Sequence, residues 1–342
     1  MNIFPAIRLC LVLPLFAVVA IAQEQQFANI GDLKLQNGGV IRQCRVGYRT
    51  FGTLAPDKSN VIVFTTWASG TTDQLKGSIG PGKLIDSTRY FVVAIDALGN
   101  GVSSSPSNSR LQPRMRFPQF TLRDTVESQY ELLTKVLRID RVKAIVGISM
   151  GGMQAFQWLV SYPDFMEKAI PIVGSPRSSP YDLMHWHAEI QALMRDRDWK
   201  GGNYTVNPSR DLDFAFGELL LTTPADYNRR KTREQVFADL AKARADAHRF
   251  DANNKIRQVQ SMMQLDVSQE FGGSLERAAK AVKAKVFVVV AKQDHVVTPE
   301  PATEFASLLG AKLLALESDC GHLANGCEAQ RLNAAVAEFL MR

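Results

Sequence analysis

The sequence contains few of the residues that usually hold a metal ion or form a cross-link. Its 342 residues include four cysteines and five histidines. No group of these residues has the spacing of a metal site. His185 and His187, which flank Trp186, are too close in sequence to share one helical face. We therefore predict no metal site and expect no cofactor.

Long blocks of one charge and internal repeats are also absent. Lysine and arginine total 40 and aspartate and glutamate total 34, which gives a formal net charge of +6 spread along the chain. Basic residues recur between 229 and 257, but acidic residues alternate with them, as on a solvated helical surface. This distribution argues against a nucleic-acid partner. Hydrophobic residues make up 46% of the chain, which is enough for a sizeable core.

An apolar run stands at the N-terminus. Residues 1–22 (MNIFPAIRLCLVLPLFAVVAIA) carry one cation, Arg8, before an apolar run that Pro14 interrupts and that ends in Ala-Ile-Ala. This layout predicts a signal peptide cleaved near Gln23, and therefore an exported chain, periplasmic or secreted, that does not bind a membrane after cleavage. An uncleaved membrane anchor is the alternative, although the run is short for a spanning helix.

The cysteines outside that segment are Cys44, Cys320 and Cys327. In an oxidising compartment Cys320 and Cys327 could close a short loop and leave Cys44 free. Their spacing allows this pairing but does not require it.

Short runs rich in branched residues alternate with longer helix-like stretches such as 122–137, in which the apolar residues share one stripe. Such runs suit strands that are buried on both faces. The alternation therefore predicts an α/β fold with a mostly parallel central sheet and helices on both faces. The expected strands are Val61–Thr65, Phe91–Ile95, Val142–Val146, Ala169–Val173, Val286–Val290 and Lys312–Leu316.

The alternation stops between about residues 175 and 268, where the pattern is helical and contains no strand candidate. We expect a helical cap over residues 176–268, inserted into a core formed by residues 23–175 and 269–342. Five large side chains either line a pocket under this cap or join the cap to the core, and the sequence supports both interpretations equally: Trp186, Trp199, Met184, Met262 and Met263.

Gly147-Ile148-Ser149-Met150-Gly151 matches the pattern G-x-S-x-G. The pattern alone is weakly specific, but a buried strand is predicted before it and an amphipathic stretch follows from Gly152. This strand–turn–helix setting is typical of a nucleophilic serine in a sharp turn. It places Ser149 at a helix N-terminus, where backbone N–H groups favour developing negative charge. We therefore predict that Ser149 is the nucleophile.

A nucleophilic serine needs a base, and the base needs a carboxylate that orients it. Asp294 and His322 each follow a predicted strand, and the order Ser, Asp, His is the α/β-hydrolase arrangement. His295 is the alternative base, although it adjoins Asp294 and is expected at the surface. Asp319 is the alternative carboxylate, although it lies in the same loop as His322. We prefer Asp294 and His322.

The negative charge of an acyl-transfer intermediate needs backbone N–H donors. We expect the N–H of Met150, directly after the serine, to be one of them. The loop after the strand Val61–Thr65 reads Thr-Trp-Ala-Ser-Gly, and Ala68 is the expected second donor.

These motifs belong to a wider likeness, because residues 45–342 resemble the homoserine O-acetyltransferase family of α/β-hydrolase-fold enzymes. The resemblance implies that Ser149, Asp294 and His322 form a catalytic triad beneath a helical cap. It also implies that Ser149 receives an acyl group and passes it to an acceptor hydroxyl. The stretches that carry the likeness are VGYRTFGTL (46–54), IGPGKLIDSTRYFVVAIDALGNG (79–101), FPQFTLRDTVESQ (117–129), GISMGGMQAFQW (147–158), YPD (162–164) and HRFDANN (248–254).

The departures from the family pattern fall where the acceptor is expected. Family members that use homoserine typically have an arginine in the first cap helix, where Ile190 stands here. They have an aspartate directly after the catalytic histidine, where Leu323 stands, and an aromatic residue near the position of Lys255. A buried carboxylate or ammonium without a counter-charge is costly, so these changes argue against homoserine. The predicted export argues against it too, because acetyl-CoA is a cytoplasmic donor.

Two functions follow from these observations. The favoured one is an exported serine hydrolase that acts on a small-molecule ester, with water resolving the acyl-serine. The alternative is an O-acyltransferase that uses an acyl donor and a small alcohol. A binding protein without turnover is disfavoured, because an intact triad would have no use in it. A homodimer is left open.

Overall fold

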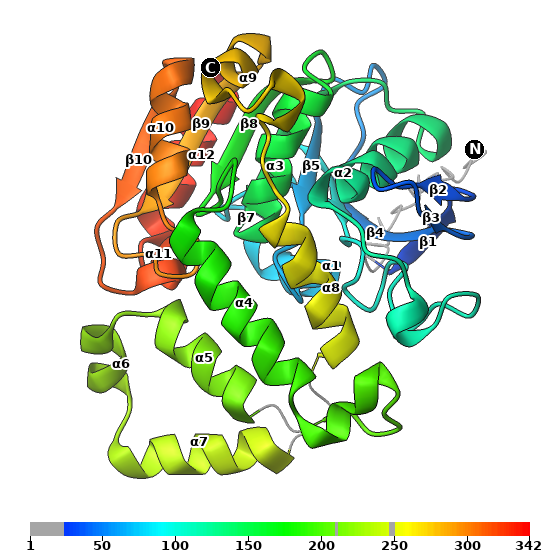
Figure 1. Cartoon of the computed structure of the whole chain (residues 1–342). Helices are drawn as coiled ribbons and strands as arrows, with labels where there is room; N and C mark the ends of the chain where they lie inside the picture. Colours follow the sequence, from blue (N-terminus) through cyan, green and yellow to red (C-terminus); the bar gives the residue numbers. More distant parts are fainter. Residues whose placement is uncertain (1–23, 209–210, 246–249) are drawn as a thin grey trace, which may run out of the picture.

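The computed structural model describes residues 24–208, 211–245 and 250–342. Its centre is an eight-stranded sheet of order β1-β4-β6-β5-β7-β8-β9-β10, which is parallel from β6 to β10 and antiparallel at β1 and β4 (Figure 1). A separate hairpin pairs β2 with β3. The strands are β1 Gln26–Asn29, β2 Leu33–Lys34, β3 Val40–Ile41, β4 Arg45–Phe51, β5 Val61–Thr65, β6 Phe91–Ile95, β7 Val142–Ile148, β8 Met166–Ile172, β9 Lys285–Ala291 and β10 Lys312–Leu316.

All six predicted strands are present, so the expected α/β fold with a mostly parallel sheet is confirmed. Strand β7 continues two residues further than expected, to Ile148, and β8 begins earlier, at Met166. Strands β1 to β4 are not among the predicted ones. These strands are short or carry partly exposed side chains, so they lack the continuous apolar run that marks a strand buried on both faces.

Both faces of the parallel strands are covered. In β5, Val61 and Val63 belong to one buried cluster, and Ile62 and Phe64 belong to the other, as the two-residue period of a strand requires. Helices α2 Leu122–Glu131, α3 Met150–Ser161, α9 Leu275–Ala281 and α10 Glu300–Leu309 cover the first face, and α1 Thr72–Leu75, α11 Ala324–Cys327 and α12 Ala329–Met341 cover the second. A π-helical turn, Leu132–Val136, extends α2 through the stretch predicted as one helix. The 3₁₀ turns are Lys76–Ser78, Arg114–Arg116, Arg197–Gly202, Gln269–Phe271 and Gly321–Leu323.

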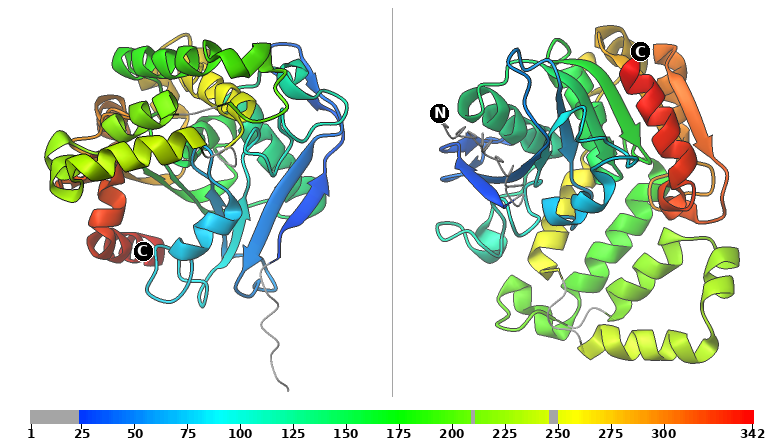
Figure 2. Two further views of the ribbon diagram at one scale, coloured as in Figure 1. Left: turned by 90° about the horizontal axis from the view of Figure 1, so that it is seen from below. Right: turned by 180° about the vertical axis from the view of Figure 1, so that it is seen from behind.

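A group of helices stands between β8 and β9, in the segment for which we expected a helical cap. They are α4 Pro180–Met194, α5 Asp211–Leu221, α6 Pro224–Arg230, α7 Arg233–Ala245 and α8 Ala252–Met263. Helices α4 to α7 form a layer beyond one edge of the core, and α8 returns from it alongside α4 (Figures 1 and 2). Residues 180–263 are called the cap below.

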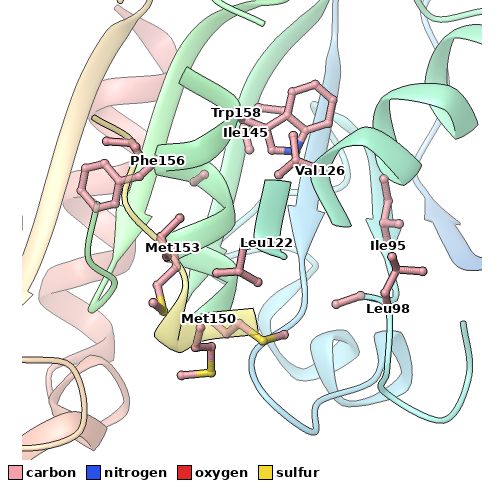
Figure 3. Close-up of a cluster of buried hydrophobic side chains, with 14 of the residues drawn as sticks. Ile95, Leu98, Leu122, Val126, Ile145, Met150, Met153, Phe156 and Trp158 are labelled. Carbon is pink, nitrogen blue, oxygen red and sulfur yellow. The ribbon is translucent and has the colours of Figure 1, made fainter. Parts of the chain in front are cut away.

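Helix α3 is the most deeply buried helix of the core. From Met150 to Val160 every side chain is buried, because α3 packs against β7, β8 and α2 at once. Figure 3 shows Trp158 beside Val126 of α2, whereas Phe156 points to the other side, where its ring meets Phe305 of α10. The indole N–H of Trp158 donates to Oε1 of Gln129 at 2.8 Å, which satisfies the polar atom of this buried ring. The start of α3 is therefore held firmly at the end of β7.

The described helices include none that is long and apolar enough to cross a membrane. The predicted signal peptide, residues 1–22, lies outside the described residues.

We predict that Cys44 does not react with thiol reagents in the folded protein. Its side chain is fully buried, and burial raises the pKa of the thiol to about 12, so the reactive thiolate is scarce at neutral pH. Titration with a chromogenic disulfide should detect no thiol in the native chain lacking residues 1–22, and one thiol after unfolding in guanidinium. Rapid labelling of the native protein at Cys44 would contradict this prediction.

Candidate active site

Ser149 is the single residue between β7 and α3, and its backbone is strained. Its backbone has φ 58° and ψ −124°, a region that residues with a side chain rarely enter. The Ser149 N–H donates to Ile172 O at 2.8 Å, and the Ser149 carbonyl accepts from the Met153 N–H at 2.9 Å. These bonds join the turn to β8 and to the first turn of α3, and they hold the serine in this conformation.

Glycine is required on either side of the serine because the backbones approach closely. A Cβ atom at Gly147 would lie 2.1 Å from the carbonyl oxygen of Gly151. At Gly151 it would lie 2.5 Å from the carbonyl oxygen of Thr65 in the neighbouring strand β5. The glycines of the G-x-S-x-G pattern therefore serve the packing of the turn, as the sequence suggested.

The structure brings Ser149, His322 and Asp294 together in one row of hydrogen bonds. His322 Nδ1 lies 2.7 Å from Asp294 Oδ2, and His322 Nε2 lies 2.8 Å from Ser149 Oγ. All three residues are buried. Since the carboxylate accepts from Nδ1–H, Nε2 is left as the acceptor of the Ser149 hydroxyl proton. This row can therefore deprotonate the serine as it attacks an acyl carbon.

Asp294 is fixed by its own turn after β9. Its Oδ1 accepts the backbone N–H groups of Val296 and Val297 at 2.9 and 3.0 Å, while Oδ2 faces His322. Both carboxylate oxygens thus have donors, which keeps a buried charge satisfied.

The two alternative residues lie away from Ser149. His295 is exposed. Asp319 accepts two hydrogen bonds from the guanidinium of Arg229 on α6, at 2.8 and 2.9 Å, and this ion pair holds the pKa of its carboxyl below the usual range. Neither residue is hydrogen-bonded to Ser149 or His322.

Met150 and Ala68, the expected N–H donors, both adjoin Ser149. Met150 is the first residue of α3, so its N–H has no partner within the helix. Ala68 lies in the loop after β5 and lines two cavities together with Ser149. The N–H of the next residue, Ser69, donates to Gln258 Oε1 at 2.7 Å and is therefore already engaged. Of these two adjacent groups, the Ala68 N–H therefore stays the expected oxyanion donor.

Two cavities meet at Ser149, Ala68, Ser69, Leu221 and Val296. The inner cavity, of about 210 Å³, lies beneath the cap and is closed by α4, α5 and α8. The outer cavity, of about 470 Å³, is lined by His322 and Leu323. The remaining lining residues of the inner cavity are His185, Trp186, Glu189, Gly217, Leu220, Lys255, Gln258, Val259 and Met262, and those of the outer one are Trp67, Ser78, Ile148 and Asn325.

Of the five large side chains for which two roles were left open, four divide between those roles and Met184 has neither. Trp186 and Met262 line the inner cavity. Trp199 is buried away from it and donates its indole N–H to Asn253 Oδ1 at 2.8 Å, Met263 packs against the core, and Met184 is 72% exposed. Met184 and Trp186 differ in exposure because they lie on opposite sides of helix α4.

Of the three positions that depart from the family pattern, two line the cavities and one does not. Lys255 lines the inner cavity, where its ammonium pairs with Glu189 and with Asp213. Leu323 lines the outer cavity and is 43% exposed. The expectation that Ile190 faces the acceptor is wrong, because Ile190 is buried in the core and Glu189, one residue earlier on α4, lines the cavity.

Helix α4 is bonded to the turn that carries Asp294. His185 Nε2 lies 2.9 Å from Val296 O, and Asp182 accepts the Thr298 N–H at 3.1 Å. Burial lowers the pKa of His185 and raises the pKa of Asp182. His185 is therefore neutral at pH 7 and donates to the carbonyl through Nε2–H.

A disulfide between Cys320 and Cys327 closes the loop that bears His322, so the pairing that the spacing allowed is present and Cys44 is free. The same loop is bonded to the cap, because the Thr223 hydroxyl donates to Asp319 O at 2.7 Å. Among the described residues, the one group with a metal-like arrangement is Asp226, Asp319 and Cys320. Arg229 bonds to both carboxylates and Cys320 is in the disulfide, so this group does not suit a metal ion.

We predict that breaking the disulfide lowers activity before it unfolds the core. Without the bridge, the loop that holds His322 against Ser149 has more freedom, whereas the sheet does not depend on it. Hydrolysis of a chromogenic ester and the far-ultraviolet circular dichroism should be measured together in increasing reductant. Cys44→Ala is the control: because it keeps the disulfide, its activity should fall with increasing reductant to the same extent as that of the unchanged protein. Full activity with the bridge shown to be broken by alkylation and mass spectrometry would contradict the prediction.

Comparison with known proteins agrees with this geometry. The alpha/beta hydrolase fold family model matches residues 79–326. A probable esterase of Corynebacterium glutamicum is 32% identical over 90% of this chain and 92% of its own length. A homoserine O-acetyltransferase of Chlorobaculum tepidum is also 32% identical, over 92% of this chain and 94% of its own. The crystal structure of an acetylester hydrolase from Corynebacterium glutamicum superposes with a TM-score of 0.86 at 28% identity, covering 93% of this chain and 96% of that one.

Proposed function

Because the chain belongs to the branch of the α/β-hydrolase superfamily that contains esterases and homoserine O-acetyltransferases, we propose that it hydrolyses small acyl esters through an acyl-serine intermediate. The observation that carries the acyl-serine chemistry is the row of hydrogen bonds from Asp294 through His322 to Ser149, which lines a cavity under the cap. The residues that close the inner cavity above Ser149 come from the cap.

In the proposed reaction, Ser149 Oγ attacks the ester carbonyl carbon as His322 Nε2 takes its proton. Asp294 stabilises the imidazolium that forms. The N–H groups of Met150 and Ala68 bind the oxyanion. The intermediate collapses when His322 gives the proton to the departing alcohol, which leaves an acyl-serine. A water molecule then attacks this ester with His322 again as the base, and His322 returns that proton to Ser149 Oγ as the carboxylic acid leaves.

The charges of the cavities support water over homoserine as the acceptor. Among the described residues that line the inner cavity, Lys255 is the one lysine or arginine, and its ammonium is paired with Glu189 and Asp213. An acceptor carboxylate would have to compete with both for it. Leu323, directly after His322, offers no charge to an acceptor ammonium. A buried charge that lacks a partner costs several kcal/mol, about enough to abolish useful binding.

Transfer of the acyl group to a small alcohol is the second candidate. It is supported by the near-complete coverage of the homoserine O-acetyltransferase relative. The row of hydrogen bonds does not separate the two candidates, because His322 can activate an alcohol as it activates water.

We further propose that the chain is exported. The N-terminal segment 1–22 has the layout of a signal peptide, and the Cys320–Cys327 disulfide suits an oxidising compartment.

The proposed hydrolysis is tested with p-nitrophenyl acetate, in the presence and absence of homoserine. We expect nitrophenol release that does not depend on homoserine, and no O-acetylhomoserine by mass spectrometry when acetyl-CoA is supplied. Ser149→Ala should lower kcat/KM by at least about 10⁴-fold, because the nucleophile is lost. Ser161→Ala, a matched change at the other end of α3, should leave it unchanged.

Two outcomes would contradict this proposal. Turnover of acetyl-CoA that requires homoserine would establish the transferase instead. Full activity of Ser149→Ala would remove the acyl-serine from both candidates.

A further inference from the structure

Gln258 is a buried polar side chain of α8 that no sequence pattern singled out. It is 1% exposed. Its Oε1 accepts a hydrogen bond from the Ser69 N–H at 2.7 Å, and its Nε2 donates to Leu98 O at 3.0 Å. Ser69 lies in the loop after β5 and Leu98 in the loop after β6. One side chain of the cap therefore joins two loops of the core at the edge where Ser149 lies.

The loop that carries Ala68 is fixed by three side chains. Gln154 of α3 and Asn100 donate to carbonyl groups at its two ends, at 3.0 and 2.9 Å. Gln258 holds the middle, at Ser69. Ser69 has φ 61°, and a residue with a side chain keeps this conformation only where its surroundings fix it.

Gln258 also decides which N–H group of the loop is available. The Ser69 N–H and the Ala68 carbonyl belong to the same planar peptide group. The hydrogen bond to this N–H therefore restrains the ψ angle of Ala68 and the orientation of that residue. The Ser69 N–H is turned toward α8, while Ala68 lines the same cavity as Ser149. A donor gives its full stabilisation only if it is aimed at the oxyanion before the reaction begins.

We infer that Gln258 is a positioning residue that aims the Ala68 N–H at the oxyanion formed when Ser149 attacks an ester. The inference rests on the proposed function. Gln258 makes no bond to a reacting atom; it acts through Ser69 and Ala68. The cap therefore completes the oxyanion site of the core as well as covering it.

The test compares Gln258→Met with Gln260→Met. Methionine fills a similar volume but removes the acceptor of the Ser69 N–H. Gln260 lies on the same helix and bonds to Arg257, not to the loop of Ala68. We expect Gln258→Met to lower kcat for p-nitrophenyl acetate about 10-fold, less than the 10²- to 10³-fold loss of a removed donor, with KM changed by less than about threefold. Gln260→Met should match the wild type in both constants.

Inhibitor binding separates positioning from general damage to the fold. A trifluoromethyl ketone adds to Ser149 and forms an oxyanion, whereas the unfluorinated ketone does not. Gln258→Met should weaken the first inhibitor by about the same factor as kcat and leave the second unchanged. Wild-type kcat and wild-type affinity for the trifluoromethyl ketone, in a variant with an unchanged circular dichroism spectrum, would overturn the inference.

Gln258→Glu decides the matter if Gln258→Met fails to fold. The new carboxyl group reproduces both hydrogen bonds when it is protonated, because it can accept from the Ser69 N–H and donate to Leu98 O. When ionised it repels that carbonyl. The ratio of its kcat to that of the wild type should therefore rise as the pH falls from about 8 to about 6, since burial raises the pKa of a carboxyl group. A constant ratio would overturn the inference.

If the proposed hydrolysis is wrong, the experiments give a result that differs from a failure of the Gln258 inference. A wild-type protein that forms the trifluoromethyl ketone adduct but hydrolyses no ester would refute the hydrolase. The ratio of ketone affinities between Gln258→Met and the wild type would still test the positioning role.

Discussion

The strained backbone of Ser149 is the constraint on which the rest of the site depends. A residue with φ 58° persists there because β7, β8 and α3 are packed so closely that the chain has no other path between Ile148 and Met150. The buried side chains of α3 supply this packing, and the glycines at 147 and 151 permit it. The hydroxyl is thereby fixed at the carboxyl edge of the sheet, where the loops after β9 and β10 bring Asp294 and His322.

The cap is bonded to each loop that supplies a group to the site. Helix α4 bonds to the turn after Asp294 through His185, and Thr223 bonds to the loop of His322. Helix α8 bonds to the loop of Ala68 through Gln258. The inserted segment and the core therefore form one hydrogen-bonded unit around Ser149. Changes in the cap are expected to affect the rate of the chemical step as well as the entry of substrate.

The sequence was informative where one local cause decides the structure. Runs of branched residues identified the six parallel strands, and the glycines around Ser149 identified the sharp turn, because each feature depends on a few adjacent residues. It was uninformative where the cause is a contact between distant segments. Nothing near Gln258 shows that its side chain meets Ser69, which is 189 residues earlier in the chain.

The error at Ile190 has a similar cause. Helix α4 was predicted as helical, but which of its faces meets the core depends on the angle at which it packs. A shift of one residue rotates the side chain by about 100°, which moves it from the cavity to the core. This rotation alone explains why Glu189 lines the cavity while Ile190, the next residue, is buried in the core.

The division of the space around Ser149 into two cavities has a consequence for how this enzyme can change. Under the proposed function the substrate is an ester with an acyl part and an alcohol part, and two cavities that share Ala68, Leu221 and Val296 offer a separate space for each part. Trp186 and Met262 can be exchanged for smaller side chains without altering Trp67 or Leu323, which line the other side. If the proposed ester binds in this way, preferences for its two halves are expected to change independently, while the serine and its partners stay the same.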